Sequence, residues 1–271
     1  MARRAVEALV DVAGETVASG DELCANLLQA GRELAASRPG VGAVAGAVGR
    51  LLAAAHRHGH LEVEELRRLI DEEAQALLDG RRRAAASIAI QLRERLTDAV
   101  VLTHSASATV REALVHTPPE KVLCTVSYPI EEGRAFVEKL RDLGLDAELV
   151  EDEDVPSRLH EVSLFLVGAD TVFRDGTLCN KIGTATLAEA AATERVPTVV
   201  ASEVIKLAPI DASEAGPLDA DTLFDLTPAE LIDEIVTEEG THPIEEVRAL
   251  VDRTPFLREG YSLLRGGELG S

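Results

Sequence analysis

The sequence predicts an α/β protein in which a helical N-terminal domain is followed by a Rossmann-like parallel-sheet domain. In the first 96 residues the apolar side chains recur at helical spacing. From Asp98 onward, short and continuous apolar runs rich in β-branched residues alternate with helical patterns. Such runs are typical of strands covered on both faces, as in a parallel sheet between two layers of helices. We therefore expect two domains, 1–96 and 97–271, with a boundary near residue 97.

Three apolar stripes predict the helices of the N-terminal domain. They fall within Leu23–Leu34, Val41–Leu52 and Leu66–Leu78, and the third leads into a long segment toward Leu96. Gly59 is expected to end the helix before the third stripe, because glycine is common just after a helix. Aromatic residues make up only 3% of the chain, so Ala, Val, Leu and Ile must build the core.

Short apolar runs predict the strands of the second domain. They are, in chain order, Ala99–Thr103, Lys121–Val126, Ala147–Val150, Leu164–Val167 and Thr198–Ala201. The intervening segments predict helices at Thr109–His116, Glu132–Leu143 and Ile182–Thr193, with a short turn near Pro156–His160. After the fourth strand, Asp175-Gly176 separates Val172–Phe173 from Thr177–Leu178, which predicts a tight hairpin.

The charge balance of the chain is strongly acidic. Asp and Glu number 48 against 27 Lys and Arg, which gives a formal net charge of −21. A surface of this sign repels phosphate backbones, so direct binding of nucleic acid is not expected. We interpret the excess of carboxylates as an adaptation to a halophilic, high-salt cytoplasm, where ions screen the self-repulsion. An acidic protein from ordinary conditions is the alternative.

The sequence gives no sign of a membrane or of an export signal. No apolar run reaches the roughly 20 residues of a membrane span, and Met1-Ala2-Arg3-Arg4 leads into an amphipathic pattern. Cys24, Cys124 and Cys179 are irregularly spaced, as expected of reduced thiols rather than of disulfides or a zinc site. We therefore expect a cytoplasmic protein that uses no metal and no other cofactor.

The carboxyl ends of the expected strands carry the polar residues of interest. In parallel sheets of this kind ligands bind at those ends, here His104-Ser105, Ser127-Tyr128, Gly168-Ala169-Asp170 and Ser202-Glu203. The carboxylate of Asp170 is placed to move protons as a general acid or base. A turn or capping role is the alternative for such an Asp.

The segment Asn180-Lys181-Ile182-Gly183-Thr184 is predicted to open the next helix. The free N–H groups of a helix start, together with Lys181 and Thr184, would suit a phosphate. Ordinary capping of the helix is the alternative.

Together these two segments form the pattern G-A-D-x9-N-K-I-G-T. It resembles the signature of the family that joins the α, β and δ subunits of initiation factor 2B with ribose 1,5-bisphosphate isomerase and methylthioribose 1-phosphate isomerase. Further pieces match in order, namely Ser37-Arg38-Pro39, Leu102-Thr103-His104, Glu203-Val204-Ile205-Lys206 and Phe224-Asp225-Leu226-Thr227-Pro228. The chain is identified as a member of this family, with a match from Arg38 to Gly240.

The departures from the family pattern concern its chemistry. The isomerases place a cysteine directly after the Thr-His pair, and here that position is Ser105. A serine hydroxyl is a much weaker acid than a thiol. The strand-two signature, usually T-E-[ST]-R-P, reads Thr125-Val126-Ser127-Tyr128-Pro129, so its carboxylate and its arginine are absent. The N-terminal R-G-A phosphate loop of the isomerases has no clear counterpart either.

The resemblance implies where the remaining site lies. Asp170 is the candidate catalytic residue, and Ser105 is the degenerate catalytic position. The substrate-binding residues that it implies are Arg38, His104, Asn180, Lys181 and Lys206.

We therefore predict an α-type, regulatory homologue of the initiation factor 2B subunits that binds a sugar phosphate or a nucleotide without isomerase turnover. The alternative is an aldose–ketose isomerase of the ribose 1,5-bisphosphate or methylthioribose 1-phosphate type, with Asp170 as the acid and base. A third interpretation is an oligomeric scaffold without a ligand. The expected partners are a phosphorylated small molecule, further copies of the chain in a dimer or larger closed oligomer formed mainly by the C-terminal domain, and a translation factor.

Overall fold

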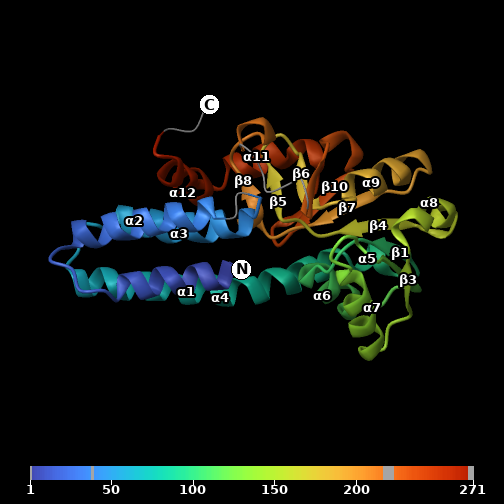
Figure 1. Ribbon diagram of the computed structural model, residues 1–271, viewed down its shortest axis with the longest axis horizontal. Helices are drawn as coiled ribbons and strands as arrows, with labels where there is room; N and C mark the ends of the chain where they lie inside the picture. The colour runs from blue at the N-terminus through green and yellow to red at the C-terminus, as the bar shows by residue number, and fades with distance from the viewer. Residues whose placement is uncertain (1, 38–39, 216–222, 268–271) are drawn as a thin grey trace.

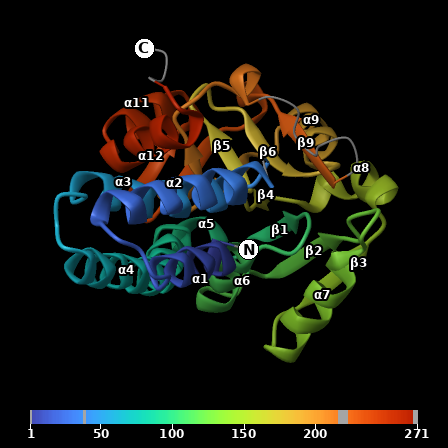
Figure 2. The same cartoon turned by 60° about the vertical axis from the view of Figure 1, so that its left-hand side comes forward.

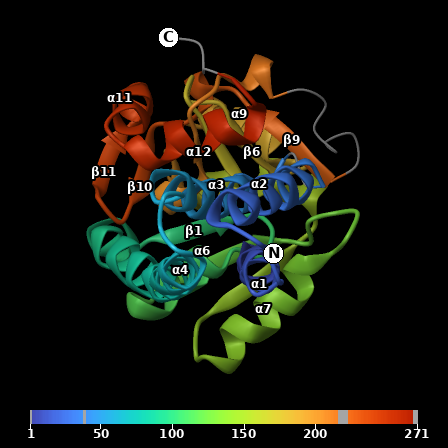
Figure 3. The ribbon, with the colours of Figure 1, turned by 90° about the vertical axis from the view of Figure 1, so that its left-hand side faces the viewer.

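The apolar stripes of the N-terminal part form long helices that share one core. In the computed structural model, which describes residues 2–37, 40–215 and 223–267, these helices are α1 (Ala2–Ala13), α2 (Gly20–Ala36), α3 (Gly42–Arg57), α4 (Val63–Gln91) and α5 (Arg93–Leu96). Leu23, Leu52 and Leu66 are buried between them. Figures 1 and 3 show α2 and α3 as one layer over α1 and α4. The predicted helices are confirmed, and α3 ends just before Gly59.

The five predicted strands all belong to one seven-stranded sheet. Its strands are β1 (Val100–Thr103), β2 (Lys121–Thr125), β3 (Ala147–Val150), β4 (Leu164–Val167), β7 (Thr198–Ala201), β10 (Glu234–Thr237) and β11 (Gly240–Pro243). Their order is β11-β10-β7-β4-β1-β2-β3, and every pair is parallel except β10 with β11. The last two strands extend the sheet beyond the predicted five.

Helices cover both faces of this sheet, which is why its strands are continuous apolar runs. On one face Val101 belongs to a core shared with α4, α5, α6 (Ala108–His116) and α7 (Glu132–Asp142). On the other face Leu102 belongs to a core shared with α8 (Val155–Arg158), α9 (Thr184–Thr193) and α11 (Val247–Asp252). Figure 1 shows α6 and α7 on the side of β1 and β4 opposite to α9.

A second sheet of four strands contains the predicted hairpin. Its strands are β5 (Thr171–Phe173), β6 (Leu178–Lys181), β8 (Leu207–Ala208) and β9 (Phe224–Thr227), in the order β8-β5-β6-β9. Gly176 turns the β5–β6 hairpin with a φ of +85°, a conformation that favours glycine. Asn180 and Lys181 pair with β9 as the last residues of β6, so their predicted place at the start of a helix is wrong.

The C-terminal helix α12 (Pro255–Arg265) returns to the N-terminal helices and packs on α3. Gly49 of α3 faces Gly260 of α12 so closely that a methyl group on Gly260 would lie 2.6 Å from backbone atoms of Gly49. The side chain of Arg32 also donates to the carbonyl of Leu263, with Nε at 3.0 Å. None of the helices in the described ranges combines the length and the apolar character that a membrane crossing needs.

Candidate functional site

The strand order reverses between β1 and β4, which are neighbours in the sheet (Figure 2). Chains leave the carboxyl ends of two such strands in opposite directions, and the crevice between them is the usual ligand site of this architecture. His104 and Ser105 follow β1, and Asp170 follows β4. The end of β6 adds Asn180 and Lys181 next to this point. The structure thus brings together most of the site residues predicted from sequence.

Glu132 joins the residue at the isomerase cysteine position to a site lysine. Its Oε1 accepts a hydrogen bond from the Ser105 hydroxyl at 2.8 Å and lies 3.1 Å from the ammonium Nζ of Lys181. Its other oxygen, Oε2, is buried without a hydrogen-bond partner among the described residues. Sequence reasoning missed Glu132, although a carboxylate in the first turn of the helix after β2 faces the same sheet edge.

His104 stands in a chain of buried hydrogen bonds. Its Nε2 lies 2.8 Å from the carbonyl of Ile182, and its Nδ1 lies 2.6 Å from the hydroxyl of Thr125. A carbonyl only accepts, so Nε2 carries the proton and Nδ1 accepts from Thr125. The Ser127 hydroxyl, 2.8 Å from that of Thr125, accepts the N–H of Ser105 at 2.7 Å.

Both ring nitrogens of His104 are engaged in hydrogen bonds to groups of the protein. Burial is the main cause that lowers the pKa of His104, so the neutral ring is favoured. The direct substrate contact predicted for His104 therefore does not fit the geometry. We assign it a positioning role, in which it holds the loop at Ile182 against the end of β1.

Asp170 is placed among charged groups at the end of β4. The pKa of its carboxyl group is raised above the usual value, mainly by burial. The ammonium groups of Lys206 and Lys181 oppose this rise, and the carboxylate of Glu132 adds to it. Lys206 is fixed in this position because its Nζ donates to the carbonyl of Ala169 at 3.0 Å. Asp170 therefore lies between the site lysines in a partly desolvated setting.

The start of α9 is already capped. Asp225 of β9 accepts the N–H of Gly183 at 2.7 Å and that of Ala185 at 3.2 Å through its Oδ2. These N–H groups are therefore not free for a phosphate, and the alternative of ordinary capping is the one observed. The Thr184 hydroxyl is also engaged, since it donates to the carbonyl of Lys181 at 2.5 Å and accepts from Asn180 Nδ2 at 3.2 Å.

The loop after β2 is held by Asp152. Its two carboxylate oxygens accept the N–H groups of Ser127 and Tyr128, at 2.8 and 3.1 Å. Tyr128, which stands where the family pattern has arginine, points its hydroxyl to Glu151 at 3.0 Å and is 44% exposed. This position therefore offers no cation to the site.

Arg38 lies outside the described residues, but the chain after it reaches the site. The hydroxyl of Thr171, which directly follows Asp170, donates to the carbonyl of Gly40 at 2.9 Å. The N–H of Gly42 donates to the same hydroxyl at 2.7 Å. Within the described ranges, no three His, Cys, Asp or Glu side chains come together as a metal-binding group.

Comparisons with known proteins agree with this architecture. The profile of the Initiation factor 2 subunit family matches residues 1–216. The ribose 1,5-bisphosphate isomerase of Archaeoglobus fulgidus is 32% identical over 214 residues, which cover 70% of this chain and 68% of that protein. The crystal structure of the translation initiation factor eIF-2B from Pyrococcus horikoshii OT3 is similar with a TM-score of 0.76 and 26% identity, over 89% of each chain.

A further similar structure is the tetrameric eIF2B β2δ2 complex from C. thermophilum. It has a TM-score of 0.81 and 22% identity, and the match covers 93% of this chain and 88% of that one. This likeness shows the fold: a helical N-terminal region followed by a parallel-sheet α/β region, as the sequence predicts.

Proposed function

The chain belongs to the initiation factor 2 subunit family, and from that premise we propose that it is an α-type, regulatory homologue of the initiation factor 2B subunits. It binds a sugar phosphate or a nucleotide at the carboxyl ends of β1 and β4 and does not isomerise it. The observation that carries this proposal is that the carboxylate of Glu132 accepts a hydrogen bond from Ser105 and pairs with Lys181. It ties the serine hydroxyl to a carboxylate, and a serine hydroxyl is a much weaker acid than a thiol. The thiol of Cys179, which lies near Asp170, is also a weak acid, because burial raises its pKa to about 12.

The charges of the site support a ligand with one phosphate. Asp170 and Glu132 supply carboxyl groups, while Lys181 and Lys206 supply ammonium groups, so the charges balance. A bisphosphate would add several negative charges to this balanced set, next to carboxylates that repel it. A sugar or nucleoside with a single phosphate places its anion near Lys181 and its hydroxyl groups near Asp170.

An aldose–ketose isomerase is the second candidate function. The A. fulgidus relative carries the name ribose 1,5-bisphosphate isomerase. Burial raises the pKa of Asp170 toward the range in which a carboxyl group exchanges protons well. This candidate requires Asp170 to act as both acid and base without a thiol partner.

Turnover separates the two functions. Ketose formation from ribose 1,5-bisphosphate and from methylthioribose 1-phosphate is followed at molar potassium chloride, with wild type and with Asp170→Asn. We expect wild type to stay at the level of the variant. Ser105→Cys should restore little activity, because Glu132 and Tyr128 remain unchanged. Robust wild-type turnover that is lost in Asp170→Asn would establish the isomerase and overturn our proposal.

Glu132→Gln is expected to tighten the binding of phosphorylated ligands. The amide keeps the size of the side chain but releases the charge of Lys181, so the affinity should rise about tenfold, or ~1.4 kcal/mol. Isothermal titration with ribose 5-phosphate and with adenosine monophosphate measures this change. Glu131→Gln is the matched control, since Glu131 pairs at 2.6 Å with the half-exposed Arg134. Equal affinities of wild type and Glu132→Gln would mean that Glu132 does not compete with the ligand.

We also propose a closed oligomer, formed mainly by residues 97–271, and a translation factor as a partner. The similarity to a chain of a tetrameric eIF2B complex supports the oligomer. The family of initiation factor 2 subunits supports the partner.

A further inference from the structure

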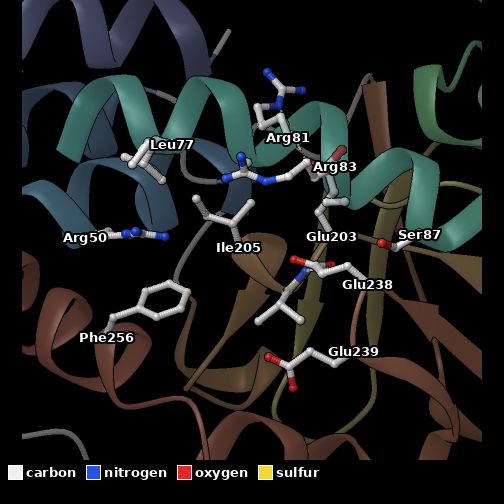
Figure 4. A pocket seen from close by; sticks show the side chains of 14 residues that line it. Arg50, Leu77, Arg81, Arg83, Ser87, Glu203, Ile205, Glu238, Glu239 and Phe256 are labelled. Atoms are coloured by element: carbon white, nitrogen blue, oxygen red, sulfur yellow. Dashed lines mark hydrogen bonds and ion pairs between the residues drawn. The ribbon is translucent and has the colours of Figure 1, made fainter. Parts of the chain in front are cut away.

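A cavity lies beside the segment Glu203–Ile205, which directly precedes Lys206. Its volume is about 380 Å³, which suits a small molecule. It lies between α4, α12, the β10–β11 turn and the short 3-10 helix η3 (Val204–Lys206). None of His104, Ser105, Glu132, Asp170 or Lys181 lines it. Figure 4 shows Arg50 and Phe256 at one side of this cavity and Glu238 and Glu239 at the other.

The acidic end of the cavity contains a buried carboxylate with an unused oxygen. Glu203 is only 4% exposed, and its Oε1 accepts from the Thr109 hydroxyl at 3.2 Å. Its Oε2 has no hydrogen-bond partner among the described residues, and the nearest cation is Arg81, with Nε at 3.7 Å. A buried charged acceptor without a hydrogen-bond donor is costly, and here only the ion pair with Arg81 offsets that cost.

Glu238 stands beside Glu203 at the same end. Its Oε2 accepts the N–H of Val204 at 2.9 Å. Burial raises the pKa of Glu238, and the nearby charge of Glu203 raises it further. Two desolvated carboxyl groups that repel each other would both be stabilised by a cation placed between them.

Arginines line the cavity as well, and one of them, Arg81, lies next to Glu203. Arg50 is held in place, because it pairs with Glu73 at 3.1 Å and its guanidinium lies 5.6 Å from the ring centre of Phe256. Arg83 of α4 also lines the cavity, and it forms no ion pair with another described residue. An anion can therefore pair with Arg83 without displacing an existing partner.

Apolar side chains form the wall between the charged ends. Leu77 and Ile205 line the cavity together with the ring of Phe256. A simple anion in this space would face Glu203 and Glu238, and a simple cation would face the arginines. Only a ligand with both charges and an apolar body satisfies the whole lining.

We propose that this cavity binds a free α-amino acid with an apolar side chain. Its ammonium group donates to Glu203 and Glu238, its carboxylate pairs with Arg83, and its side chain packs on Ile205 and Phe256. The site is separate from the one at the ends of β1 and β4, and its occupancy does not depend on the function proposed there.

Isothermal titration of the whole protein with leucine at molar potassium chloride tests this site. We expect wild type to bind leucine, and Arg83→Gln and Glu238→Gln each to weaken the binding at least tenfold. Arg82→Gln is the matched control, since Arg82 is the next residue of α4 and does not line this cavity. N-acetylleucine, without the ammonium group, and leucinamide, without the carboxylate, should not bind.

Three results would overturn the proposal. The first is the absence of leucine binding to folded wild type. The second is binding that Arg83→Gln leaves unchanged, which is decisive even if Glu238→Gln does not fold, because Arg83 is an exposed residue of α4. The third is displacement of leucine by a sugar phosphate. Added ribose 5-phosphate should not displace leucine, and displacement would place leucine in the sugar-phosphate site instead.

Discussion

Transfer from about 1 M to about 0.01 M potassium chloride is expected to lower the melting temperature sharply, because the Debye length grows from about 3 Å to about 30 Å. Even if every Lys and Arg paired with one carboxylate, 21 acidic residues would keep no basic partner. Their repulsion acts across the whole folded chain once the screening is removed. A loss of several kcal/mol corresponds to about 10 °C or more for a chain of this size. Thermal unfolding followed by circular dichroism measures it.

The shape of the salt titration identifies the cause. If screening is responsible, most of the rise in melting temperature should appear by about 0.15 M salt, where the Debye length is already about 8 Å. This rise should also be the same for potassium chloride and potassium bromide. Stability that keeps rising at molar salt and depends on the anion would indicate exclusion of salt from the protein surface instead. A melting temperature that is constant throughout would remove the support for adaptation to high salt.

Gly260→Ala is expected to be strongly destabilising. The added methyl group would meet backbone atoms of Gly49 at 2.6 Å, and backbone cannot move aside as a flexible side chain can. Helices α3 and α12 must then separate, at a cost of about 2–3 kcal/mol. For a chain of this size that corresponds to a melting temperature lower by roughly 5–10 °C.

Gly49→Ala, on the facing helix, and Gly80→Ala, in α4, provide graded controls. A methyl group on Gly49 would lie 3.0 Å from the nearest atom of Gly260, so Gly49→Ala should cost less. Around Gly80, in α4, no atom of the described residues outside the adjoining chain and helix backbone lies within 4 Å of an added methyl group. Gly80→Ala should therefore raise stability by up to about 1 kcal/mol through helix propensity. A Gly260→Ala protein as stable as Gly80→Ala would show that α3 and α12 do not pack at this distance.

The sequence by itself determined five strands of the main sheet and the N-terminal helices that the three apolar stripes predict. Leu164–Val167 is apolar at every position because both faces of β4 are covered by helices, and this requirement is visible locally. The rule that ligands bind at strand ends then located Ser105 and Asp170. The division into domains 1–96 and 97–271 stays a prediction, since α12 returns to pack on α3.

The tertiary structure alone decided how the site residues are used. Asn180 and Lys181 looked like a helix start, but pairing with Asp225 and Phe224 makes them a strand. That pairing also brings Asp225 to the N–H groups that a phosphate would have needed.

Glu132 is the second case. It lies on α7, yet it reaches Ser105 after β1 and Lys181 at the end of β6. Contacts of this kind join residues far apart in the chain, so local periodicity and propensity carry no information about them. They arise only when the packing of the helices on the sheet has fixed which side chains meet.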